Sequence, residues 1–253
     1  MIDHFSGVAP AYAAHRPHYP PALFDWLAAL VRRHDLVWDC AAGSGQATRG
    51  LASWFRRVVA TDMSRAQLAA APPRARVLAW AARAEASGIR RGRVDLVAVG
   101  QALHWFDLSA FYAEVRRVLA AGGAVAAWTY ANPRLGEPAS DTVLQHFYRD
   151  AVGPYWPAER RLVESRYATL PFPFREVTAP DFAMTAEWTL AEVVGYVGTW
   201  SAVSAYRAAQ GRDPVPTLAA ALEPTWGDPR RRRPVTWTLT VRAGYADAPP
   251  EER

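Results

Sequence analysis

Two acidic residues and two glycines near the start of the chain have the types and spacing of a nucleoside-binding site. Asp39 ends an apolar segment and is followed by Gly43 and Gly45 in a turn of small residues, and Asp62 ends a second apolar segment. Glycines let a turn approach a ligand closely, and a carboxylate at the end of the next strand can accept hydrogen bonds from ribose hydroxyls. The spacing therefore predicts a βαβ unit that binds a nucleoside.

Two classes of nucleoside cofactor use such a unit, and the residues around the turn separate them. A dinucleotide fingerprint has a third glycine where this chain has Thr48. The carboxylate of Asp39 would repel a pyrophosphate, but it could hold the ammonium of an amino-acid moiety, as in S-adenosylmethionine. A structural role, in which Asp39 caps the loop through its backbone amides, is compatible with either cofactor.

Four segments of the chain carry motifs of one known family. The first is the turn 39–45, which reads Asp-x-Gly-x-Gly-x-Gly with Ala41 in place of the first glycine. The others are a Tyr-x-x-x-Arg-Pro-x-Tyr-Pro opening, a fourth strand with its loop, and a late helix, at residues 5–20, 94–107 and 196–202. Together they resemble the class I S-adenosylmethionine-dependent methyltransferases of the trans-aconitate methyltransferase-like subgroup.

That resemblance implies an α/β fold of the doubly wound, Rossmann-like methyltransferase type. We expect a seven-stranded, mostly parallel sheet in the order 3-2-1-4-5-7-6, with strand seven antiparallel, helices on both faces and a substrate-covering insertion. We expect one domain over residues 1–253, which divides into an N-terminal arm and helix, a cofactor-binding core, the insertion, and C-terminal helices with the final strand, at 1–33, 34–130, 131–190 and 191–253.

Hydrophobic periodicity and turn residues also predict alternating helices and strands. The expected helices are 21–33, 46–55, one that begins after Ser64 as its N-cap, 108–119 ended by Gly122 and Gly123, and 141–151. The expected strands are 36–39, 58–62, 77–80, 95–99, 124–130, 176–184 and 235–241. This alternation is typical of a doubly wound sheet, which binds ligands at the carboxyl ends of its strands.

The resemblance implies that S-adenosylmethionine binds at these ends and leaves as S-adenosylhomocysteine. Asp62 is expected to bind the ribose, Met63 to pack on the adenine, and Arg16 to pair with a carboxylate of the cofactor or the substrate. The alternative for the opening segment is an arm packed on the sheet edge. The expected cofactor contacts are Tyr12, Arg16, Asp39, Ala41, Gly43, Gly45, Asp62, Met63, Ala84, Gln101 and Ala102.

His104 follows the fourth strand and is the candidate catalytic residue, with His146 as the alternative base. It would serve as a general base for a hydroxyl, phenol or amine acceptor, whereas a carboxylate acceptor needs no deprotonation. A structural imidazole bonded to a neighbouring carbonyl is an equally consistent interpretation. The expected substrate contacts are His104, Trp105, Tyr130, Tyr155, Trp156 and Trp200, and the alternative for the aromatic residues is packing of the insertion on the sheet.

The predicted reaction is methyl transfer to a small molecule by in-line displacement. Since members of the resembled subgroup methylate small carboxylic acids, O-methylation of an organic acid or a hydroxylated metabolite is expected. A nicotinamide-dependent oxidoreductase and a noncatalytic binding protein on a methyltransferase fold stay open as alternatives. The missing third glycine argues against the first, and the retained Asp39, Gly43, Gly45 and Asp62 argue against the second.

Composition bounds the class of protein and its partners. A chain of 253 residues, 51% of them hydrophobic, suits one α/β domain, and no apolar run approaches the ~20 residues of a membrane span. The start of the chain lacks a signal-peptide pattern, so a cytoplasmic protein without membrane contact is expected. The single Cys40 excludes an intramolecular disulfide and a cysteine-based metal cluster, and we expect no metal.

The positive charge is carried by arginine alone. The net charge is +5, and the 29 basic residues include no lysine. Basic runs such as Arg230 to Arg233 and the pair Arg56-Arg57 are expected to be solvated turns, so the basic balance does not establish a nucleic-acid partner. The expected partner is a small-molecule acceptor, and the composition does not predict an oligomeric state.

Overall fold

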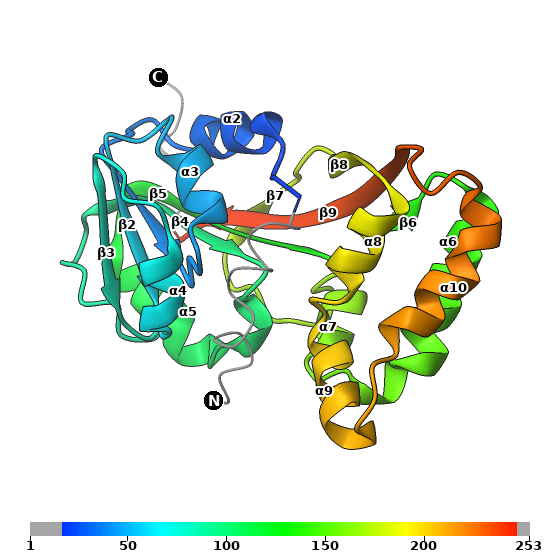
Figure 1. Cartoon of the computed structure of the whole chain (residues 1–253). Helices are drawn as coiled ribbons and strands as arrows, with labels where there is room; N and C mark the ends of the chain where they lie inside the picture. Colours follow the sequence, from blue (N-terminus) through cyan, green and yellow to red (C-terminus); the bar gives the residue numbers. More distant parts are fainter. Residues whose placement is uncertain (1–16, 247–253) are drawn as a thin grey trace. The chain divides into compact units, whose positions relative to one another are not determined.

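The computed structural model describes residues 17–246, which fall into two compact units (Figure 1). The sheet unit contains Tyr19–Tyr130, Leu162–Phe182 and the chain from Leu239 onward. The helix-rich unit contains Ala131–Arg161 and Ala183–Thr238. The single domain expected from the resemblance stays a prediction.

A parallel sheet forms the centre of the sheet unit. Its adjacent strands are β3 (Val77–Ala81), β2 (Arg57–Asp62), β1 (Leu36–Cys40), β4 (Val94–Gly100) and β5 (Leu119–Tyr130). The long strand β9 (Arg233–Tyr245) continues the sheet antiparallel to β5, and β7 (Arg175–Val177) pairs with β9 in turn. This order confirms the predicted Rossmann-like fold and its antiparallel last strand.

Helices accompany most of the parallel strands, as the periodicity predicted. α2 (Pro21–Ala29) precedes β1, α3 (Gln46–Leu51) and α4 (Arg65–Ala70) connect β1 to β2 and β2 to β3, and α5 (Leu108–Val118) connects β4 to β5. A loop without a helix connects β3 to β4, and α2 and α3 are shorter than expected. The Ser64 side chain accepts a hydrogen bond from the Gln67 N–H, which confirms the predicted N-cap of α4. No helix within residues 17–246 is long and apolar enough to cross a membrane.

The boundary between α5 and β5 differs from the prediction. β5 begins at Leu119, directly after the helix, so Gly122 and Gly123 lie inside the strand and do not end the helix. A Cβ on Gly123 would lie 2.9 Å from the Ala120 carbonyl oxygen. The pairing of β5 with β4 also shifts register between Val94 and Leu96. The two glycines therefore serve an irregular strand start, where the backbone is crowded and bent.

The predicted strand 176–184 is wrong, because two shorter strands occupy that region. β7 ends at Val177 and β8 begins at Phe182 and ends at Trp188, with Pro180 between them. Proline cannot donate a ladder hydrogen bond, which interrupts a continuous strand. With the two-residue strand β6 (Arg134–Leu135), the described residues form a sheet of nine strands instead of seven.

The helix-rich unit contains strands β6 and β8, the first half of β9, and four helices: α6 (Pro138–His146), α8 (Leu190–Val197), α9 (Ser201–Gln210) and α10 (Val215–Trp226). α6 continues as a π-helical turn over Phe147–Ala151, where a regular helix 141–151 was expected. The segment 196–202, expected as one helix, contains a break between α8 and α9. The short η3 (Gly153–Tyr155) lies in this unit, and α7 (Arg160–Glu164) contributes residues to both.

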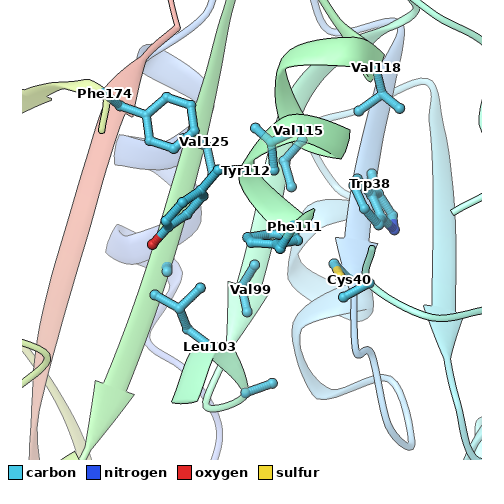
Figure 2. Packing of buried hydrophobic residues seen from close by; sticks show 14 of the residues in the cluster. Trp38, Cys40, Val99, Leu103, Phe111, Tyr112, Val115, Val118, Val125 and Phe174 are labelled. Carbon is cyan, nitrogen blue, oxygen red and sulfur yellow. The ribbon is translucent and has the colours of Figure 1, made fainter. Parts of the chain in front are cut away.

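One face of the parallel sheet is buried against α5 (Figure 2). Phe111 of α5 and Trp38 of β1 are both fully buried, with ring centroids 6.2 Å apart. The indole N–H of Trp38 donates to the Thr61 hydroxyl at 2.8 Å, so this large side chain is buried without an orphaned donor. Each such apolar side chain contributes about 1.5–3 kcal/mol, which fixes the strands whose carboxyl ends carry the predicted site.

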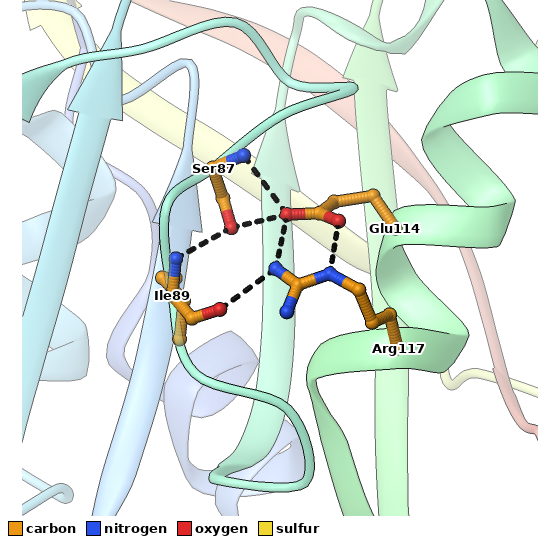
Figure 3. Close-up of polar contacts among 4 residues, drawn as sticks. All are labelled: Ser87, Ile89, Glu114 and Arg117. Atoms are coloured by element: carbon orange, nitrogen blue, oxygen red, sulfur yellow. Dashed lines mark hydrogen bonds and ion pairs between the residues drawn. The ribbon is translucent and has the colours of Figure 1, made fainter.

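A buried ionic network ties α5 to the loop after β3 (Figure 3). Glu114 accepts two hydrogen bonds from Arg117, at 2.6 and 2.7 Å, and one from the Ser87 N–H at 2.9 Å. Arg117 also donates to the Ile89 carbonyl oxygen at 2.7 Å. Burial alone raises the pKa of Glu114, but the hydrogen bonds from Arg117 and Ser87 outweigh it and lower that pKa to about 2.

This network makes stability depend on acid pH. Because the Glu114 pKa is lower in the folded chain, its contribution is complete above the ordinary pKa near 4.5 and is lost as the pH falls toward 2. We expect Glu114→Gln to lower the free energy of unfolding by about 2 kcal/mol at pH 7. Urea unfolding of the original chain and of the variant at pH 7, 4.5 and 3 measures the effect. The difference between their free energies of unfolding should become smaller below pH 4.5. Glu223→Gln, at an exposed position, is the control, and a difference independent of pH would contradict the assignment.

Candidate active site

The turn between β1 and α3 has a left-handed backbone at three positions. Gly43 has φ +55° and Gly45 has φ +85°, and Gly45 is also the N-cap of α3. A Cβ on Gly43 would meet only the Gln67 side chain, at 3.8 Å, so the backbone angle is what requires glycine there. The small-residue turn predicted from the sequence is therefore present, at the carboxyl end of β1.

The third left-handed position is Ala41, where the family motif has glycine. Its φ is +57°, an angle that costs a residue with a Cβ about 1–2 kcal/mol. Ala41 therefore carries strain that glycine at this position would not.

We expect Ala41→Gly to raise the free energy of unfolding by about 1 kcal/mol, because relief of the left-handed strain exceeds the added entropy of the unfolded chain. Ala42→Gly is the matched control, since Ala42 has no positive φ and the substitution should destabilise by about 0.4–1 kcal/mol. Chemical denaturation of the two variants measures both effects. Equal destabilisation by the two substitutions would contradict strain at Ala41.

Asp62 joins the glycine turn to the start of α4. One carboxylate oxygen accepts from the Gly43 N–H at 2.9 Å, and the other accepts from the Ser64 N–H at 2.8 Å. A carboxylate has about four acceptor sites, so two are left for hydroxyl groups of a ligand. Asp62 is partly exposed, and the side chain of the next residue, Met63, is 50% exposed. Both predicted ligand contacts are therefore accessible.

Asp39 is buried at 1% exposure and accepts a hydrogen bond from the Thr48 hydroxyl of α3. Burial raises the pKa of Asp39 to about 7; the bond from Thr48 opposes this rise and the charge of Asp62 adds to it. This environment favours the structural interpretation, in which Asp39 holds the turn in place through its bond to Thr48 at the start of α3. Thr48 bonds to Asp39 through its backbone as well as its hydroxyl, so a backbone contact of the expected kind is present beside the side-chain bond.

The loop after β3 places Ala84 in a buried position, at 7% exposure. Arg83 and Glu85 on either side of it form an ion pair at 3.2 Å. Glu85 also accepts from the N–H of Asp107, the N-cap of α5, at 3.0 Å. The predicted adenine contact thus lies in a loop that is braced at both flanks.

Gln101 follows β4 and fastens its loop to the end of β5. Its side-chain oxygen accepts from the Thr129 hydroxyl at 2.8 Å and the Tyr130 N–H at 2.9 Å, and its amide nitrogen donates to the Tyr130 carbonyl. Gln101 has φ +58°, a strained angle held by these bonds. Ala102 beside it is buried. The backbone N–H of Gln101 also donates to the Trp128 carbonyl oxygen at 2.8 Å, so Gln101 fixes the shape of the loop that follows β4.

His104 lies in the short helix η1 (Leu103–Trp105), with its ring centroid 4.8 Å from that of Trp105. Its Nδ1 is 2.8 Å from the hydroxyl of Tyr167, a fully buried residue with φ +59°. The Tyr167 carbonyl oxygen accepts from Arg242 of β9 at 3.0 Å. The imidazole is therefore bonded to a hydroxyl, whereas the structural interpretation expected a carbonyl, and Tyr167 is a residue that the sequence did not suggest.

The predicted substrate contacts fall into both units. His104, Trp105 and the buried Tyr130 belong to the sheet unit, and Tyr155, Trp156 and Trp200 belong to the helix-rich unit. The predicted contacts Tyr12 and Arg16 lie outside the described residues.

Trp156 and Trp200 belong to one aromatic cluster of the helix-rich unit. Their ring centroids lie 5.6 Å apart, and Tyr148 packs on both, at 5.1 and 5.6 Å. Tyr155 lies apart from this cluster, because its ring packs on Tyr206 of α9 and its hydroxyl accepts from Gln210. The structure therefore brings two of the three predicted aromatic contacts together.

Arg160 completes this cluster and was not predicted. Its guanidinium lies 4.5 Å from the Trp156 ring centroid and 5.4 Å from that of Tyr148, and its Nε donates to the Tyr148 hydroxyl at 2.8 Å. Arg160 forms no ion pair with any residue between 17 and 246. The buried Nε1 of Trp156 also has no hydrogen-bond partner within that range. Among the described residues, a guanidinium without an ion-pair partner beside an indole N–H without an acceptor suits an anionic ligand.

No group of three His, Cys, Asp or Glu side chains within residues 17–246 is arranged to hold a metal ion. The single Cys40 is fully buried, as expected for a small apolar residue, and burial raises the pKa of its thiol.

Comparison with known proteins gives consistent results. Residues 38–127 match the family described as methyltransferase domain. A Dictyostelium discoideum protein named as a methyltransferase is 30% identical over 233 residues, which are 89% of each chain. The structure of an Anaeromyxobacter dehalogenans protein, described as a type II methyltransferase, is 44% identical with a TM-score of 0.85, and covers 91% of this chain and 97% of that one.

A more distant solved structure shares the fold alone. It is described as a methyltransferase from an antibiotic biosynthesis pathway of Anabaena variabilis, at 15% identity and a TM-score of 0.53. The match covers 86% of this chain and 96% of that chain.

Proposed function

The chain belongs to the class I S-adenosylmethionine-dependent methyltransferases, and from this membership we propose that it methylates a small organic acid. The proposal includes the trans-aconitate methyltransferase-like subgroup, whose motifs the sequence resembles. It also includes a cytoplasmic enzyme whose partner is a small molecule and not a nucleic acid.

The residues around the glycine turn suit S-adenosylmethionine, which when bound supplies an activated methyl group. The two free acceptor sites of Asp62 match the two hydroxyls of a ribose. The exposed Met63 offers a polarizable side chain to an adenine, and the left-handed Gly43 and Gly45 keep side chains away from the approach. Ala84, Gln101 and Ala102 would line the same site, with Gln101 holding the loop after β4 in place.

Arg160 is the observation that carries the choice of an acid. A guanidinium presents paired N–H groups that match a carboxylate, and the rings of Trp156 and Tyr148, tilted by 42° to each other, both contact it and hold it in one orientation. The Trp156 N–H supplies a further donor, and Trp200 supplies an apolar wall. We assign this cluster to a second carboxylate of the acceptor, distinct from the carboxylate whose oxygen takes the methyl group.

The role of His104 follows from the acceptor. A carboxylate oxygen attacks without losing a proton, so an acid acceptor leaves the imidazole as a lining group held by Tyr167. For a hydroxyl acceptor, His104 would instead take the proton, with Tyr167 fixing its orientation. Trp105 and Tyr130 would border the reacting group in either case.

Two measurements test the proposal in sequence. Titration calorimetry should give micromolar binding of S-adenosylhomocysteine and none of NADH. The protein is then incubated with methyl-labelled S-adenosylmethionine and a panel of small di- and tricarboxylic acids, with phenols as the comparison set. If the labelled products are hydrolysed by base, they are methyl esters, and this result supports an acid acceptor. Label transfer to phenols alone would replace the acid by a hydroxyl acceptor, and binding of NADH alone would contradict the cofactor.

A further inference from the structure

A pocket of about 590 Å³ lies at the amino ends of the first three strands of the sheet unit. Its walls come from the segment before β1, the chain after α3, the start of β2 and the residue before β3. The lining residues are His34, Ser53, Trp54, Phe55, Arg56, Arg57 and Arg76. The volume is in the range of sites for small molecules.

This pocket is separate from the methyltransferase site. Strand β2 begins with Arg57 in the pocket and ends with Asp62 at the glycine turn. Five residue steps of an extended strand place these two positions roughly 16 Å apart, at opposite ends of β2. A ligand of the pocket would therefore occupy a second site.

The lining carries three positive charges and no negative one. Arg56, Arg57 and Arg76 are exposed, and none of them forms an ion pair with a residue in the described range. The carboxylate of Asp35 is bonded to Arg33 at 2.7 Å, which lowers its pKa, and the charge of Arg56 adds a smaller lowering. The three guanidinium groups are therefore left for an anion.

An aromatic surface lies beside these charges. The Trp54 side chain is 45% exposed, one of three large apolar side chains exposed within residues 17–246. The neighbouring Phe55 is buried and packs against His34, whose Nε2 lies 3.0 Å from the Ala28 carbonyl oxygen. Phe55 and His34 are therefore held in place by contacts within the chain. The exposed indole is the surface on which a flat ring can stack.

We propose that this pocket binds a nucleoside di- or triphosphate. The phosphates would contact Arg56, Arg57 and Arg76, and the base would stack on Trp54. Phosphate oxygens match the paired N–H groups of a guanidinium. A nucleotide carries both phosphates and a flat base, whereas a simple inorganic anion would contact only the arginines.

Titration calorimetry with ADP tests the assignment on the full chain. Saturating S-adenosylhomocysteine is present, so that adenosine cannot enter the methyltransferase site. ADP should bind with a dissociation constant below about 1 mM, and the double variant Arg56→Gln/Arg57→Gln should weaken it at least tenfold. Arg230→Gln/Arg231→Gln removes the same charge from another exposed pair and should leave the affinity unchanged. Absence of ADP binding, or equal loss in both double variants, would overturn the proposal.

A second comparison separates the base from the phosphates. Trp54→Ala should weaken ADP severalfold while leaving inorganic pyrophosphate unchanged. Binding of pyrophosphate as tight as that of ADP would overturn the nucleotide, and an oligonucleotide that binds 100-fold more tightly than ADP would replace it by a nucleic acid. Because the readout is a difference between two arginine pairs, failure of S-adenosylhomocysteine to bind would leave this test intact.

Discussion

Replacing Asp62 with alanine is expected to weaken the binding of S-adenosylhomocysteine by about 100-fold. The carboxylate is proposed to accept two hydrogen bonds from the ribose, and a bond to a charged group contributes about 1.5–3 kcal/mol. A loss of about 3 kcal/mol corresponds to roughly 100-fold in the dissociation constant. The variant also loses the contacts to Gly43 and Ser64, which hold the turn in place. Calorimetric titration of the purified variant measures the effect.

Ser64→Ala provides the control for a purely structural effect. It removes the N-cap of α4 beside the site while leaving the Asp62 carboxylate in place. We expect it to lower stability by about 1 kcal/mol and to leave the affinity near that of the original chain. A folded Asp62→Ala variant that binds as tightly as the original chain would remove Asp62 from the ribose.

The second large effect is expected at Arg160. Replacing it with alanine should raise the KM for an acid acceptor by about 100-fold, because a charge-assisted pair of about 3 kcal/mol is lost. The change in kcat should be smaller, since a guanidinium away from the reacting oxygen binds ground state and transition state alike. Steady-state methyl transfer to the best acid of the panel measures both constants.

Arg161→Ala is the matched control for this experiment. Arg161 is the next residue in α7 and is exposed, so its removal changes the charge equally without touching Trp156 or Tyr148. An analogue of the same acid gives a second control: the carboxylate assigned to Arg160 is replaced by a primary amide, which lacks the charge, and the reacting carboxylate is kept. If Arg160→Ala and Arg161→Ala shift the KM equally, the carboxylate is bound elsewhere.

The parts of the site that the sequence predicted are those encoded by short spacings. Gly43 and Gly45 mark the turn by residue type alone, and Asp62 ends an apolar strand that is recognisable from periodicity. The order of the parallel strands followed from the family resemblance that this spacing supports. Local patterns of this kind survive folding because each is confined to one strand or turn.

The missed residues act through partners that are distant along the chain. Tyr167 bonds to His104, which lies 63 positions earlier in the chain. Arg160 could be recognised only from its contact with Tyr148, which lies in the π-helical turn. Backbone strain was equally hidden, because Ala41 and Gln101 are ordinary residue types whose positive φ is imposed by their surroundings. The predicted strand 176–184 was split because of one residue, Pro180. The apolar residues on both sides of it had favoured one continuous strand.

The burial of Cys40 gives the chain a practical property for labelling. The thiol is fully buried at the end of β1, its raised pKa keeps it protonated, and the sequence contains no other cysteine. A cysteine introduced at an exposed position of α9 or of α5 would therefore be the one reactive thiol of the molecule. Fluorophores or spin labels can report on each compact unit in turn, without first removing a native residue from the core.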